Sequence, residues 1–73
     1  MVSEEKLKEL AKQIKILRAK NDLTQEELAI KSGLGFSTIV CLESYRKIPR
    51  VETLVKIAEA CNVDEQELLK YID

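Results

Sequence analysis

The chain has 73 residues, of which 45% are hydrophobic and 34% are charged, and its formal net charge is −1. These values are ordinary for a folded globular protein and exclude a disordered chain, while the charge is not that of a generic nucleic-acid binder. The length predicts one domain over residues 1–73, small enough for helix caps and ion pairs to matter to its stability.

The sequence contains two cysteines, Cys41 and Cys61, and no histidine. Their spacing fits no metal site, so we expect neither a metal nor a cofactor. No apolar run approaches the ~20 residues that a membrane span needs. We therefore expect a cytoplasmic protein with reduced thiols and no membrane partner. An enzyme is not expected, because no nucleophile constellation or carboxylate pair in an apolar pocket is indicated.

The first predicted helix spans about residues 4–20. Apolar residues recur at spacings of three and four from Leu7 to Leu17, which indicates one buried face. Ser3 is the expected N-cap. Asn21 is expected to end the helix in the left-handed conformation.

Two short helices follow, over about residues 25–32 and 36–44. Thr24 and Glu27 have the spacing of a capping box at the start of the first. Gly33 tolerates the positive φ of a sharp turn between them. A short helix, a glycine turn and a second short helix predict a helix-turn-helix.

A polar connection over residues 45–50 leads to two further helices, expected over about 51–61 and 65–72. Asp64 and Glu67 have the spacing of a second capping box. No strand pattern is present. The sequence therefore predicts an all-α fold, a compact bundle of five helices.

Charge is distributed unevenly along the chain. The segment over residues 31–50 contains one acid, Glu43, and four cations: Lys31, Arg46, Lys47 and Arg50. Its net charge is therefore +3, and that of the remainder of the chain is −4. A positive segment on an acidic body suits docking of one face on a polyanion. The alternative is that these cations only make a loop soluble.

Segment 14–69 resembles the Cro and phage-repressor type of helix-turn-helix, also called the Xre family. The resemblance runs through Leu17-Arg18, the run Leu23–Ala29, Gly33, Ser37-Thr38-Ile39, Leu42-Glu43, Pro49, Thr53-Leu54, Ile57-Ala58 and Asn62-Val63. It implies the lambda-repressor-like bundle and a sequence-specific DNA-binding transcriptional regulator of the repressor type. Such proteins usually act as dimers on a palindromic operator.

The resemblance also implies roles for individual residues. It places Thr24 and Gln25 against the DNA backbone. The exposed face of the helix over residues 36–44 would read base edges in the major groove, and it matches Phe36, Ser37, Val40 and Cys41. The loop that follows would grip phosphate, and it matches Ser44, Arg46, Lys47 and Arg50. The sequence itself adds Thr38 as a hydrogen-bonding group near the start of that helix. Arg18 and Glu43 match a pair that is typically buried, and the alternative is two solvated surface charges.

The expected recognition face departs from the family by being apolar at Phe36, Val40 and Cys41. Base readout depends mostly on hydrogen bonds, which apolar side chains do not form. Such side chains would instead contact thymine methyl groups. Phe36 has three open interpretations: a base contact, a core residue, or part of a protein-binding patch. Tyr45 replaces a common glycine, and we expect a turn without positive φ there and a hydroxyl that donates to phosphate. A redox role for Cys41 is not expected, because no nearby cation explains a lowered pKa.

The sequence leaves two functions to compare, a DNA-binding regulator and a helix-turn-helix module that binds protein through its apolar face. A homodimer is expected under the first. Its contact is predicted on the C-terminal helix, which carries more apolar residues than its own packing needs: Leu68, Leu69, Tyr71 and Ile72.

Overall fold

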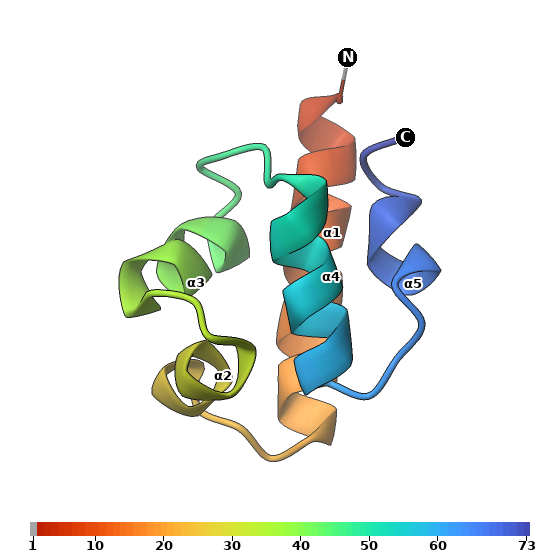
Figure 1. Ribbon diagram of the computed structural model, residues 1–73. Coiled ribbons are helices and arrows are strands. Elements are labelled where there is room, and N and C mark those ends of the chain that lie inside the picture. Colours follow the sequence, from red (N-terminus) through yellow and green to blue (C-terminus); the bar gives the residue numbers. More distant parts are fainter. Residues whose placement is uncertain (1) are drawn as a thin grey trace.

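A computed structural model describes residues 2–73, which form five α-helices: α1 (Glu4–Lys20), α2 (Gln25–Ser32), α3 (Phe36–Glu43), α4 (Val51–Ala60) and α5 (Gln66–Leu69). In Figure 1, α1 and α4 overlap in the middle of the view, α2 and α3 lie on one side of them and α5 on the other. The described residues contain no strand, so the predicted all-α bundle is confirmed. None of the helices described is long and apolar enough to cross a membrane.

Aliphatic residues from all five helices make one core. Six large side chains are fully buried: Ile14, Leu28, Ile39, Leu54, Ile57 and Leu68. In α1 the buried residues Leu10, Ile14 and Leu17 recur at spacings of four and three, which turns one face of the helix inward. Ala29 is 5% exposed, and its small side chain allows α2 to pack closely against α3 and α4.

The N-terminal caps of α1 and α2 form as the sequence predicts. The Ser3 hydroxyl accepts from the Lys6 N–H at 3.2 Å. Thr24 and Glu27 make both bonds of the capping box, at 3.0 Å and 2.8 Å. Each cap satisfies backbone donors that the first helical turn leaves without partners.

Two predictions about helix ends are wrong. Asn21 has φ −96°, and the left-handed residue after α1 is Asp22, with φ +54°. The Asn21 side chain instead donates to the Leu17 carbonyl oxygen at 2.8 Å, which ties down the last turn. The reciprocal capping box of Asp64 and Glu67 does not form, because the Asp64 carboxylate accepts from the Gln66 N–H at 2.8 Å.

Helix α5 is shorter than predicted and ends at Leu69. Beyond it the chain continues in tight turns, in which the N–H groups of Tyr71 and Ile72 donate to carbonyl groups three residues earlier. Leu68 and Leu69 are 0% and 9% exposed and belong to the core. The prediction of a dimer contact through the C-terminal helix is wrong for these two residues, which pack within one copy, and stays a prediction for the half-buried Tyr71 and Ile72.

The expectation that Tyr45 avoids positive φ is also wrong. Tyr45 has φ +47°, in the left-handed region. Its N–H donates to Leu42 and the following Arg46 N–H donates to Cys41, at 3.3 Å and 3.1 Å. This pair of bonds closes the last turn of α3 as a Schellman motif, which glycine normally completes.

Replacing Tyr45 with glycine is expected to stabilise the fold by about 1 kcal/mol. The left-handed conformation costs an L-residue roughly 1–2 kcal/mol, and the greater freedom of glycine in the unfolded chain takes back part of the gain. Urea unfolding measures the change. Asn62→Gly is the matched control, because Asn62 holds the equivalent position after α4 at φ +57° and asparagine tolerates it. A loss of stability in Tyr45→Gly contradicts the account of strain.

Candidate nucleic-acid interface

Helix α3 is held to the bundle by one face and leaves the other open. Ile39, Leu42 and Glu43 are buried, at 0%, 5% and 3% exposure. On the opposite side, Phe36 and Ser37 are exposed, and Val40 and Cys41, one turn further along, are half-buried. Figure 1 shows α3 at the outer edge of the bundle, packed on α2. Of the three interpretations of Phe36, the core one is excluded, because half of its side chain is exposed.

The N-terminal end of α3 lacks a capping side chain. Gly35 is its N-cap and provides no side-chain hydrogen bond, and the first turn carries no acidic residue. The free N–H groups and the helix dipole therefore favour an anion or a hydrogen-bond acceptor at this end. Thr38, half-buried in the same turn, adds a hydroxyl.

Arg18 and Glu43 join α1 to α3 through two parallel hydrogen bonds. Arg18 Nε and Nη2 donate to the two Glu43 carboxylate oxygens, at 2.8 Å and 3.1 Å. Arg18 Nη1 also donates to the Leu23 carbonyl oxygen at 3.0 Å. Glu43 is 3% exposed, so its charge depends on this partner. The pair fixes the inner face of α3 relative to α1.

Gln25 contacts the same carboxylate. Its side-chain amide donates to Glu43 Oε1 at 3.1 Å, which links the start of α2 to the end of α3. This link was not predicted from the sequence, because nothing in the spacing of residues 25 and 43 signals it. The second amide hydrogen and the amide oxygen of Gln25 are open to another partner. Thr24 is exposed, and its oxygen is engaged by the capping bond from Glu27.

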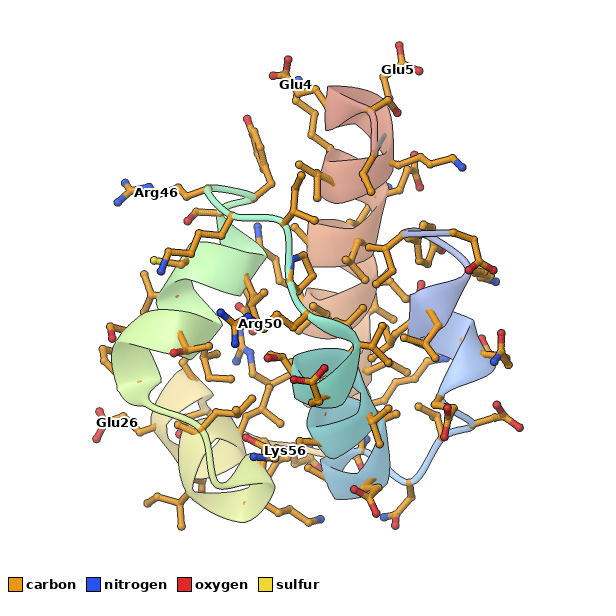
Figure 2. The ribbon with its side chains drawn as sticks, turned by 45° about the horizontal axis from the view of Figure 1, so that its top comes forward. Glu4, Glu5, Glu26, Arg46, Arg50 and Lys56 are labelled. Carbon is orange, nitrogen blue, oxygen red and sulfur yellow. The ribbon has the colours of Figure 1, made fainter. Side chains whose placement is uncertain are left out.

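The connection after α3 brings cations beside its open face. Arg46, Lys47 and Arg50 are exposed. Figure 2 shows the Arg46 side chain pointing away from the bundle and the Arg50 side chain lying between α3 and α4. A groove between α3 and the start of α4 is lined by Thr38, Cys41, Lys47 and Arg50, among others.

Pairing within the bundle leaves this surface positive. Arg18, which lies outside segment 31–50, takes up the charge of Glu43. The four cations of that segment are then left without an acid of their own segment. Ser44 contributes less than predicted, because its hydroxyl proton goes to the Val40 carbonyl oxygen at 2.8 Å.

The two cysteines differ in environment. Both are free thiols; Cys41 is half-buried beside the groove and Cys61 is buried. Burial raises the pKa of the Cys61 thiol; the nearby charge of Lys31 opposes this and that of Glu43 adds to it. A raised pKa favours the thiol over the thiolate, the nucleophilic form.

The contribution of Cys61 to folding stability is expected to be constant below about pH 9 and to fall above it. The folded state keeps the Cys61 proton to higher pH than the unfolded chain, whose thiol has its ordinary pKa of 9.0, so the stabilising contribution is lost as pH rises through the folded pKa. Urea unfolding between pH 7.5 and about 9.5 measures it. Cys61→Ala should flatten this decline and the Cys41→Ser control should not, and an unchanged decline in Cys61→Ala refutes the assignment.

Comparison with known proteins agrees with this architecture. The helix-turn-helix family matches residues 14–68. The chain is 40% identical over 60 residues to an uncharacterized HTH-type transcriptional regulator of Archaeoglobus fulgidus, covering 82% of this chain and 86% of that protein. A similar regulator of Methanocaldococcus jannaschii is 35% identical over 60 residues, with 82% and 91% covered. The cryptic phage CTXphi transcriptional repressor RstR of Vibrio cholerae is 38% identical over 56 residues, which are 77% of this chain and 50% of RstR.

The chain therefore belongs to the helix-turn-helix proteins of the Cro and phage-repressor type. This is a family of DNA-binding transcriptional regulators that are not enzymes. Residues 25–43, from the start of α2 to the end of α3, form the helix-turn-helix itself.

Proposed function

We propose that this protein is a sequence-specific, repressor-like regulator that places the open face of α3 in the major groove of DNA. The observation that carries the proposal is the two-sided character of α3. Its inner face is fixed by Ile39, Leu42 and the Arg18–Glu43 pair, whereas the residues of its outer face, from the exposed Phe36 to the half-buried Cys41, lie outside the core cluster. A helix of this width fits the major groove of B-form DNA.

Two flanking features grip the backbone in this proposal. On one side are Thr24 and Gln25, where Gln25 Nε2 is already oriented by Glu43 at 3.1 Å. On the other are the exposed side chains of Arg46, Lys47 and Arg50, with Tyr45 and Ser44 beside them. Glu26 and Glu27 in the first turn of α2 oppose a phosphate there. The basic connection therefore carries most of the affinity for phosphate.

The bases are read by a face with few hydrogen-bonding groups. Phe36 and Val40 are one turn apart and suit contact with thymine methyl groups, with Cys41 beside them, while Ser37 and Thr38 supply the polar contacts. Sequence-dependent DNA shape supplies the remaining selectivity. We expect preferred sites with thymines at the positions that face Phe36 and Val40.

Selection of bound duplexes from a random pool tests this function. We expect a thymine-bearing motif, repeated as a palindrome with half-sites ~34 Å apart if the protein binds as a homodimer. Replacing the selected thymines with uracil removes only the methyl groups and should weaken binding by about fourfold per contacted methyl, the equivalent of ~0.8 kcal/mol. Failure to bind any duplex at low salt refutes the function.

A protein-binding module is the second candidate, favoured by the 50% exposure of Phe36. Such an exposed aromatic residue beside Val40 would form the centre of an apolar contact. Phe36→Ser with Val40→Ser separates the two candidates. A regulator loses affinity for its selected duplex and keeps its oligomeric state, whereas a protein-binding module loses its oligomer or complex.

A further inference from the structure

The end of α3 differs from the ends of the other long helices. Helices α1, α2 and α4 end in the same pair of backbone hydrogen bonds as α3. In each of them a residue that tolerates positive φ is followed by a half-buried apolar residue: Asp22 by Leu23, Gly33 by Leu34 and Asn62 by Val63. Helix α3 instead ends in Tyr45 and Arg46, and both are exposed. This is the one of the four ends that breaks both local preferences.

The strained tyrosine holds a cation from another helix. Lys8 Nζ of α1 lies over the Tyr45 ring, 5.5 Å from its centroid. Tyr45 is 43% exposed and lies outside the core cluster. A cation–π contact at such an exposed site returns less free energy than the left-handed conformation costs. Local stability therefore does not explain Tyr45, and a strained residue retained beside a binding surface indicates a role in binding.

Lys8 thereby joins the cations of the connection after α3. Tyr45 is the immediate neighbour of Arg46, and Figure 1 shows this connection rising beside the N-terminal half of α1. The other partner of Lys8 is Glu4, with Nζ and Oε1 3.9 Å apart and side chains 55% and 74% exposed. Such an exposed pair is weak, so the ammonium group exchanges Glu4 for a phosphate at little cost.

We propose that Lys8 is a further phosphate contact of the DNA-binding surface and that Tyr45 is the residue that positions it. The proposal rests on the proposed function and extends the basic surface from the 44–50 connection onto α1. It explains why the turn after α3 carries an aromatic residue where its backbone favours glycine. The tyrosine hydroxyl is not required for this role, since the ring alone holds the ammonium group.

The salt dependence of binding to the selected duplex tests Lys8. Lys8→Gln should make the slope of log K against log salt shallower by about 0.9, the value of one phosphate contact. Lys12→Gln is the matched control, because Lys12 is an exposed lysine one turn further along the same helix. Equal slopes for Lys8→Gln and Lys12→Gln overturn the proposal and leave the proposed function standing. A wild-type chain that binds no duplex overturns both.

Two further variants test the positioning role and the exchange of partners. Tyr45→Gly should unfold at higher urea concentration than wild type and yet bind DNA more weakly, whereas a purely structural role moves both quantities together. Glu4→Gln should tighten binding by freeing Lys8, and this gain should vanish in the Lys8→Gln background. Tighter binding by Glu4→Gln in both backgrounds overturns the proposal, because Glu4 would then act only by repelling the DNA phosphates and not through Lys8.

Discussion

Replacing Arg18 with methionine is expected to destabilise the fold by about 3–5 kcal/mol, because the change strands a buried charge. Glu43 is 3% exposed and accepts two hydrogen bonds from the Arg18 guanidinium, at 2.8 Å and 3.1 Å, so that only the bond from the Gln25 amide at 3.1 Å would remain. The Leu23 carbonyl oxygen loses its Arg18 donor as well. For a fold of this size, such a loss is comparable with the whole free energy of unfolding.

Urea unfolding at neutral pH measures this loss. Lys15→Met on the same helix removes an exposed cation and should change stability by no more than about 0.5 kcal/mol. The double variant Arg18→Met with Glu43→Leu should recover most of the loss, because neither charge then stays buried alone. A cost below ~1 kcal/mol for Arg18→Met would identify the pair as an ordinary surface contact.

Neutralising Arg46, Lys47 and Arg50 together with glutamine is expected to weaken DNA binding by roughly 10²–10³ at 0.1 M salt. Each phosphate contact contributes about 0.9 to the slope of log K against log salt, so the slope should become shallower by about 2.7. Stability should be nearly unchanged, since all three side chains are exposed. Titration of the selected duplex at several salt concentrations gives both the affinity and the slope.

The matched control removes three cations from a different surface. Lys12, Lys15 and Lys20 are exposed on α1, and their replacement by glutamine changes the net charge by the same amount. If both triple variants lose affinity equally, the protein responds to total charge, and the basic connection has no special place in binding. A selective loss in the Arg46–Arg50 variant supports the proposed interface.

Local sequence signals predicted most of the fold because they act over one or two helical turns. The apolar spacing in α1, the capping box of Thr24 and Glu27, and the positive φ at Gly33 each depend only on neighbouring residues. Those signals failed where a competing local bond existed. The Asp64 carboxylate bonds the Gln66 N–H in place of the predicted box, and the Asn21 amide bonds the Leu17 carbonyl oxygen, leaving the left-handed position to Asp22.

The site was predicted less completely, because its geometry depends on contacts between distant segments. The resemblance to the family implied that Arg18 and Glu43 meet, and the structure joins them at 2.8 Å. The contacts of Gln25 with Glu43 and of Lys8 with Tyr45 correspond to no recognisable spacing in the sequence. The apolar surplus of the last helix led to the prediction of a dimer contact, but Leu68 and Leu69 are buried within one copy, and this burial depends on how α5 meets α1 and α4.

Amide chemical-shift mapping during titration with the selected duplex tests whether the open face of α3 binds DNA. The largest shifts are expected along α3 from Phe36 to Cys41 and in the connection around Arg46 and Lys47, with smaller ones at Thr24 and Gln25. The last turns of α4 and the whole of α5 should stay unperturbed. Shifts confined to α5 and the end of α4, with α3 unchanged, would contradict this mode of binding.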